Sequence, residues 1–363
     1  MKVKEITNAI EAVAPLYLQE SWDNSGMQVG DPDCEVSGVL LCTDVREEIV
    51  DEAIERGANM IISHHPLLFR GLKKIVGRSY QERIVAKAIK HDITIYCAHT
   101  NMDSTVGGVN FKMAEKLGLK DVKILSPQRN TQCKLVVFVP TDYVSQVERA
   151  MCDAGAGRLG NYDSCSYKLE GVGQYRALDG ASPFLGEIGG IHSEPETRVE
   201  VLVNKALCGR VVTAMIKAHP YEEPAFDIIA LENDDKYAGL GVIGNVEPQN
   251  ARMFLENVKN AFEVTTVRYS GNLDREVRRI AMCGGAGSEF TGLAMSQGAD
   301  VYITGDMKYH EFQGNEDRII LVDIGHYESE HYTKEIFFDI ITKKKPNFAV
   351  DFATSEKNQV NYL

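Results

Sequence analysis

The sequence predicts an α/β protein in which two α/β lobes fold together, with a ferredoxin-like α+β domain inserted between them. Strand and helix patterns alternate from residue 36 to residue 98, and the alternation returns after residue 239. Between these segments the order strand–helix–strand occurs twice, which is typical of a ferredoxin-like domain. A chain of 363 residues is also longer than a single domain with one hydrophobic core usually is. We therefore expect an N-terminal lobe at 1–127, an inserted domain at 128–235 and a C-terminal lobe at 236–363.

The N-terminal lobe begins with an amphipathic helix pattern at residues 3–14. A turn-rich segment, Ser21–Gly30, follows and holds the only tryptophan, Trp22. We interpret it as a structural corner with Trp22 as a core anchor, and the alternative is a piece of a site floor. The remaining pattern predicts parallel strands joined by right-handed crossovers. Its elements are a strand at Val36–Val45, a helix at Glu47–Arg56 capped by Gly57, a strand at Asn59–Ser63, a helix at Gln81–His91 and a strand at Ile93–Ala98.

The inserted domain follows an expected connector, Ser126–Thr131. Its predicted elements are a strand at Lys134–Pro140, a helix at Tyr143–Ala154, strands at Tyr167–Tyr175 and Thr197–Val203, a helix at Leu207–Ala218 and a strand at Phe226–Leu231. The predicted elements of the C-terminal lobe are helices at Arg252–Phe262, Phe290–Gln297 and His326–His331, with strands at Val277–Cys283, Asp300–Thr304, Arg318–Ile324 and Phe348–Phe352.

The composition limits the possible functions. The formal net charge is −13, from 52 acidic and 39 basic side chains. Nucleic-acid affinity comes mainly from clustered Lys and Arg, so nucleic acid is an unlikely partner. We find no apolar run long enough to span a bilayer and no signal-peptide pattern, so we expect no membrane partner. The eight cysteines are dispersed without a Cys-x-x-Cys pair, which favours reduced thiols and a cytoplasmic location.

Histidines and a carboxylate follow two successive predicted strands. His64 and His65 end the strand at Asn59–Ser63, and His99 and Asp103 follow the next strand. The carboxyl ends of parallel strands meet at one edge of a sheet, where such folds place their ligands. Two polar loop histidines that bind nothing, and an Asp103 that caps a helix, are the alternatives.

A third pair lies near the end of the chain. His326 and Glu330 are four residues apart on a predicted helix, so both side chains face the same way. Three imidazoles and two carboxylates exceed what one tetrahedral site holds, and they suit two divalent cations that share a carboxylate. We expect Zn, Fe or Mn, with the ligands His64, His65, Asp103, His326 and Glu330.

These motifs resemble one known family. The sequences His64-His65-Pro66, His99-x-x-x-Asp103, His326-x-x-x-Glu330, Trp22-Asp23-Asn24-x-Gly26 and Gly305-Asp306-x-x-x-His310 are similar to those of the GTP cyclohydrolase I type 2 homologs, the Ngg-interacting-factor-like proteins. The resemblance covers 1–127 and 238–363. It implies two metal ions bound by the five residues, and a toroidal homohexamer with the metal sites facing its interior.

The middle segment resembles the PII/CutA-like insert of longer family members. The matching residues are Gly171–Arg176 and His219–Pro224. The resemblance implies a trimer-forming domain that covers the torus. His219, Glu222 and Glu223 suggest a further metal site, but we favour a rigid loop between two prolines.

Other residues have less specific roles. Gly284–Ser288 is interpreted equally well as a phosphate cradle or as a tight turn. We expect Asp306 and His310 to contact a ligand residue or the substrate, and His99 to orient water or to act as acid or base. His331 is expected to face solvent.

Together these features predict a metal-dependent hydrolase that acts on a nucleotide or a related small phosphorylated substrate. The family resemblance implies an activity like that of GTP cyclohydrolase. No catalytic residue is assigned. The alternative is a non-catalytic, metal-binding or regulatory hexameric assembly.

Overall fold

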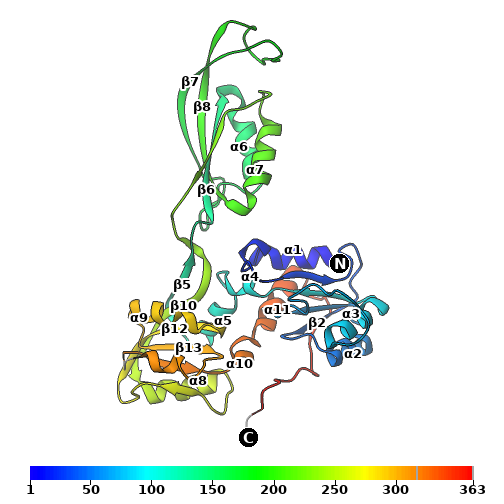
Figure 1. Cartoon of the computed structure of the whole chain (residues 1–363), viewed down its shortest axis with the longest axis vertical. Helices are drawn as coiled ribbons and strands as arrows, with labels where there is room; N and C mark the ends of the chain where they lie inside the picture. The colour runs from blue at the N-terminus through cyan, green and yellow to red at the C-terminus, as the bar shows by residue number, and fades with distance from the viewer. Residues whose placement is uncertain (316–317, 362–363) are drawn as a thin grey trace. The chain divides into compact units, whose positions relative to one another are not determined.

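The first sheet is built from short strands, and the three central ones are wholly buried. In the computed structural model (Figure 1), which describes residues 1–315 and 318–361, its strand order is β1-β4-β3-β2-β15. β2, β3 and β4 are parallel to one another, and β1 is antiparallel to β4. The bounds are β1 (Gly26–Val29), β2 (Val39–Cys42), β3 (Met60–Ser63), β4 (Thr94–Cys97) and β15 (Val350–Phe352).

Helices cover both faces of this sheet, because alternate residues of each strand point to opposite sides. Val39 and Leu41 pack with α1 (Val3–Val13) and α11 (Thr333–Lys344). Leu40 and Cys42 pack instead with α2 (Glu47–Arg56) and α3 (Tyr80–Lys90). The predicted cap of α2 is confirmed, since Gly57 has φ 68°.

The second sheet has the strand order β11-β14-β13-β12-β10-β5. β13 is parallel to both β12 and β14. Its helices are α8 on one face and α9 on the other. The bounds are β5 (Lys120–Gln128), β10 (Asp235–Asn250), α8 (Ala251–Ala261), β11 (Arg268–Ser270), β12 (Glu276–Ala286), α9 (Thr291–Ser296), β13 (Val301–Gly305) and β14 (Ile320–Asp323).

Each lobe contributes one strand to the sheet of the other lobe. β15, at the end of the chain, pairs in parallel with β2 of the N-terminal lobe. β5, from the N-terminal lobe, lies at the edge of the second sheet beside β10. Each sheet is therefore completed by the other lobe, so the two fold together, as expected. Contacts group them into one compact unit, Met1–Pro127 with Lys236–Leu363, and place Gln128–Asp235 in a second unit.

The second unit has the ferredoxin-like order strand–helix–strand–strand–helix–strand. Its sheet is antiparallel, in the order β7-β8-β6-β9, and both helices pack on one face. The bounds are β6 (Gln132–Pro140), α6 (Val144–Asp153), β7 (Ser166–Arg176), β8 (Ile191–Asn204), α7 (Lys205–Ala218) and β9 (Phe226–Ala230). The expected connector is shorter than predicted, because β5 continues to Gln128.

Three short helices complete the first unit: α4 (Thr100–Asp103), α5 (Val109–Lys116) and α10 (His326–Glu330). Short 3-10 turns occur at Leu16–Leu18, Thr141–Tyr143, Ser288–Phe290 and Glu311–Asn315. None of the helices formed by the described residues is long and apolar enough to cross a membrane.

Candidate metal centre

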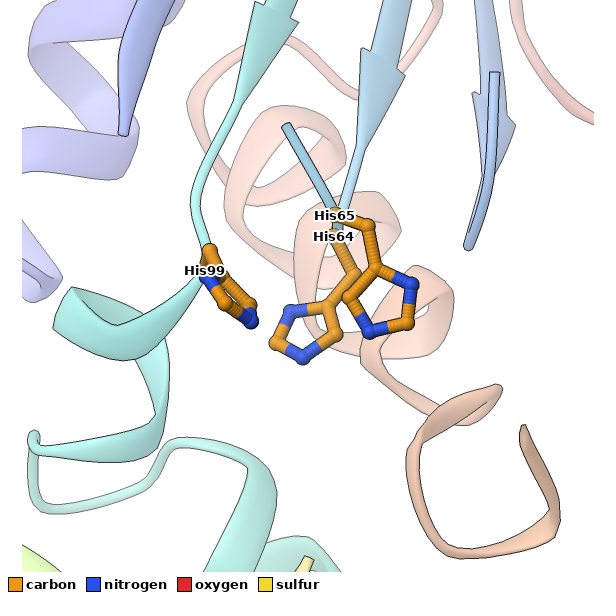
Figure 2. Close-up of side chains that lie close together, drawn as sticks. All are labelled: His64, His65 and His99. Carbon is orange, nitrogen blue, oxygen red and sulfur yellow. The ribbon is translucent and has the colours of Figure 1, made fainter. Parts of the chain in front are cut away.

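The histidine pair stands where β3 leaves the sheet. The backbone N–H groups of His64 and His65 still donate to Cys42 and Thr43 of the neighbouring strand, at 3.2 and 2.9 Å. Both rings nevertheless point to the same side, with centroids 4.9 Å apart. Figure 2 shows them beside His99, which follows the adjacent strand β4. The ends of two parallel strands thus bring three imidazoles together, as the sequence predicted.

Helix α10 of the C-terminal lobe adds the two remaining side chains. The carboxylate atom Oε2 of Glu330 lies 2.9 Å from Nε2 of His65 and 3.0 Å from Nε2 of His326. It also lies 3.7 Å from Nε2 of His64. Asp103, at the end of α4, places Oδ1 3.7 Å from the same nitrogen of His64. The structure therefore brings all five predicted residues to one place.

These five residues form two groups that share one carboxylate. His65, His326 and Glu330 have potential ligand atoms within 4.8 Å of one another, and so do His64, Asp103 and Glu330. Two buried atoms of the second group, Nε2 of His64 and Oδ1 of Asp103, have no hydrogen-bond partner among the described residues. Unpaired buried polar atoms are costly, and a cation between them would pair both. The donor set therefore fits divalent metal ions.

The electrostatics of the cluster reflect its burial. Burial raises the pKa of Asp103 to about 8, with the nearby charge of Glu330 adding to the effect. Burial opposes a charge on His326, but the hydrogen bond and charge of Glu330 raise the pKa of this imidazole to about 9. Carboxylates and imidazoles thus interact at close range around the buried carboxylate of Glu330, while the His326 side chain stays 34% exposed.

Each histidine is oriented through its other ring nitrogen. Nδ1 of His64 lies 3.0 Å from the carbonyl oxygen of Ala98. Nδ1 of His65 lies 2.9 Å from Asp44, and Nδ1 of His326 lies 2.8 Å from Asp306. Such contacts fix the orientation of a metal-binding imidazole and raise its basicity. Asp306 thus contacts a candidate ligand, as expected.

Asp23 holds His99 in the same manner. Its Oδ1 atom lies 2.9 Å from Nδ1 of His99, and its Oδ2 atom accepts from both the backbone N–H and the hydroxyl of Thr100. Burial opposes ionisation of Asp23, but the hydrogen bond and charge of His99 keep the pKa of this carboxyl well below its usual range. His99 is left with Nε2 as its available ring nitrogen, close to His64 and His65.

A cavity of about 430 Å³ opens beside this cluster and is lined by His65, His99, Asp103, His326 and Glu330, among others. Trp22 also lines it and is 61% exposed. The prediction that Trp22 anchors the core is therefore wrong. The Trp22–Gly26 turn is part of the site floor, because the buried carboxylate of Asp23 fixes the loop against His99 and turns the indole outward.

The glycine-rich segment at 284–288 is a turn at the irregular end of β12: the register against β13 shifts before Ala286, Gly285 has φ 62°, and the 3-10 turn begins at Ser288. The N–H groups of Gly284, Gly285 and Gly287 donate to the side chains of Asn110, Ser329 and Thr304, each at 2.9 Å. These donors are therefore occupied within the fold, which favours the turn over a phosphate cradle. A side chain at Gly285 would place its Cβ 2.3 Å from Oε1 of Glu330, so the turn must approach the candidate ligand closely.

Three histidines for which the sequence suggested a role or an exposed position lie outside the cluster. His310 is exposed and lies 3.5 Å from Gln313, outside the cavity lining. The expectation that His331 faces solvent is wrong, because its ring stacks on Tyr327. Both ring nitrogens of His219 lie 3.0 Å from backbone atoms, as a rigid loop requires.

Asp44 was missed by sequence reasoning. It follows β2, and the carboxyl end of that strand lies at the same sheet edge as the histidine pair. A polar residue just beyond a third parallel strand was the available signal.

Known proteins match this chain over nearly its whole length. The family described as Duf34/NIF3 (NGG1p interacting factor 3) matches residues 1–360. A protein of Halalkalibacterium halodurans named GTP cyclohydrolase 1 type 2 homolog is 42% identical over 324 residues, which cover 88% of this chain and 87% of that protein. A Bacillus subtilis protein of the same name is 36% identical, with 96% and 93% covered.

Solved structures give the same result. The crystal structure of a Bacillus cereus protein related to NIF3 is 37% identical and has a TM-score of 0.83, with 100% of this chain and 99% of that chain covered. A Staphylococcus aureus protein, with the same coverage, is 31% identical and has a TM-score of 0.79. From the match over residues 1–360 and these relatives, the chain belongs to the Duf34/NIF3 (NGG1p interacting factor 3) family.

Proposed function

We propose that this protein binds two divalent metal ions and is a metal-dependent hydrolase acting on a nucleotide or a related small phosphorylated substrate. The observation that carries the proposal is the pair of ligand groups that share the buried carboxylate of Glu330. His65 and His326 would hold one ion, and His64 and Asp103 the other. Zn, Fe and Mn all accept such imidazole and carboxylate donors.

A pair of divalent metal ions, when bound, supplies Lewis-acid polarisation and a nucleophile at neutral pH. The chain itself supplies orientation and proton transfer. Asp44 and Asp306 hold His65 and His326 in place, and Asp23 holds His99 so that its Nε2 atom can take or give a proton in the cavity.

GTP is the first substrate to test, because the curated relatives are named GTP cyclohydrolase 1 type 2 homologs. Protein loaded separately with Zn, Fe(II) or Mn(II) should be incubated with a nucleotide panel. Metal content and product formation are measured for the natural sequence, for His65→Ala and for Glu330→Ala. His310→Ala is the matched control, because this exposed histidine lies outside the cavity lining.

We expect both site variants to lose metal and turnover, and the control to keep them. Metal binding without turnover of any substrate would favour a non-catalytic, metal-binding or regulatory assembly. Failure to bind any of the metals would refute both the hydrolase and the non-catalytic metal-binding assembly.

We also propose that the protein assembles as a homohexamer in which the inserted domain forms trimers. The support is the resemblance of the motifs described above. Sedimentation of the full chain, and of a chain lacking residues 128–235, tests this: the full chain should be hexameric, and a monomeric full chain would refute it.

A further inference from the structure

Three large aromatic side chains remain exposed around the cavity beside the metal cluster. Trp22 is 61% exposed, Phe69 48% and Tyr80 46%. Single exposed aromatic residues are common, but three around one cavity mark a binding surface. They come from three separate segments of the chain, so no single local turn accounts for their position.

The rings of Trp22 and Phe69 are anchored against His99. Their centroids lie 5.9 and 5.6 Å from that of His99, and both rings stand nearly perpendicular to it, at 73° and 87°. His99 is itself held by Asp23. The two aromatic rings are therefore positioned by the same residue that faces the metal cluster, and a ring bound against them would lie next to the candidate ligands.

Away from the candidate metal ligands, the charged side chains of the cavity are carboxylates. Its lining contains the carboxylates of Glu20, Asp44, Asp103, Glu289 and Glu330. Among the described residues that line it, none is a lysine or an arginine. Away from the candidate metal ligands, a phosphate group would therefore find no lysine or arginine to hold it. Carboxylates instead accept hydrogen bonds from N–H and amino groups.

We infer that the cavity wall around Trp22 and Phe69 recognises a planar nitrogen heterocycle bearing N–H or amino donors, so that any phosphate group is left to the metal ions. This inference rests on the proposed function, since it takes the cavity to be the substrate site. The ring stacks on Trp22 and Phe69, and its donors face the carboxylates of Glu20 and Glu289. A volume of about 430 Å³ lies within the range of ordinary small-molecule sites.

The chain carries its own reporter for this inference, because Trp22 is its only tryptophan. Metal-loaded full-length protein should be titrated with guanosine, GTP and inorganic triphosphate, while indole emission is recorded and calorimetry measures affinity. We expect guanosine to quench the emission and to bind within about tenfold of the affinity of GTP. Inorganic triphosphate should leave the indole emission unchanged, because it has no ring to stack on Trp22, and metal content is checked after each titration.

The matched variants are Phe69→Leu and Tyr309→Leu. Tyr309 is 74% exposed, belongs to the same compact unit and does not line the cavity. Loss of one stacked ring should weaken guanosine binding on the order of tenfold. The Tyr309 variant should bind guanosine unchanged. Equal weakening in both variants would overturn the inference, as would triphosphate binding as tight as that of GTP without any guanosine binding.

The result also separates this inference from the proposed function. Guanosine binding with no hydrolysis of any nucleotide supports the heterocycle site and refutes the hydrolase. Hydrolysis of nucleotides that are recognised only through triphosphate supports the hydrolase and refutes the heterocycle site. Indole emission that depends on protein concentration and does not respond to guanosine would assign the exposed rings to a second copy of the chain, which also refutes the inference.

Discussion

The Oε2 atom of Glu330 lies 2.9 Å from the Nε2 atom of His65, although 265 positions separate the two residues along the chain. His65 follows β3 of the first sheet, and Glu330 ends α10, which packs on β12 of the second sheet. The contact therefore joins the two lobes at the candidate metal centre. Changes that shift either partner should alter metal binding more than they alter folding.

Gly285→Ala tests the close approach of the turn to Glu330. An added Cβ would lie 2.3 Å from Oε1 of Glu330, and Gly285 has φ 62°. Gly298→Ala is the control, because Gly298 has φ 75° and nothing lies within 4 Å of its added Cβ. Both variants should lose about 1 kcal/mol of unfolding free energy from the backbone strain. Only Gly285→Ala should lose metal, measured as bound ions per chain. Full metal content in this variant would show that Glu330 is not a ligand.

Asp44→Asn tests the orientation of His65. Asp44 contacts Nδ1 of His65 at 2.9 Å, and loss of its charge should weaken metal binding about 10- to 100-fold. Competition with a chelator measures the affinity. Asp51→Asn provides the comparison, because Asp51 pairs with Lys87 on the surface and should leave metal affinity unchanged. An unaltered affinity in Asp44→Asn would mean that the carboxylate does not orient the imidazole.

Lys334 and Glu356 form a buried ion pair that supports the segment after β2, which carries Asp44. Glu356 accepts from the backbone N–H groups of Thr43 and Asp44, and both members of the pair are largely shielded from water. Lys334→Met leaves the carboxylate buried without its cation, so we expect a loss of about 3–5 kcal/mol in unfolding free energy. Urea denaturation measures this loss. The double variant Lys334→Met, Glu356→Gln should recover part of it, and a loss equal to the sum of the single variants would contradict a direct pair.

Glu52 gives a pH-dependent contribution to stability. Burial opposes its ionisation, but hydrogen bonds from Ser355 and Thr354 lower the pKa of Glu52 to about 2. Because the folded-state pKa lies below the unfolded value, the contribution is complete above about pH 4.5 and is lost as the pH falls towards 2. We expect Glu52→Gln to lose about 1–3 kcal/mol at pH 7.

The difference between Glu52→Gln and the natural sequence should shrink progressively below pH 4.5 in urea unfolding experiments. Glu55 lies on the same helix and its side chain is exposed, so Glu55→Gln should change the unfolding free energy little, both at pH 7 and below pH 4.5. A constant difference down to pH 3 would show that the stabilisation does not depend on the charge of Glu52.

Much of the site could be predicted because its parts are local. His64 and His65 follow an apolar run that can only be a buried strand, and His326 and Glu330 share one face by helical spacing. The meeting of polar residues at the carboxyl ends of parallel strands is a general property of such sheets. The exchange of β5 and β15 was not predictable, since short strands carry no signal for which sheet they will join.

Hydrophobic periodicity acts over a few residues, so the sequence alone was enough to predict which residues end each strand and which functional groups their side chains carry. The folded structure was needed to show that Asp23 and Asp44 orient His99 and His65, that Trp22 faces the cavity, and that Gly285 lies against Glu330. These relationships depend on the packing of two sheets built from both ends of the chain. Their geometry is set by side-chain fit between distant segments, which no local pattern records.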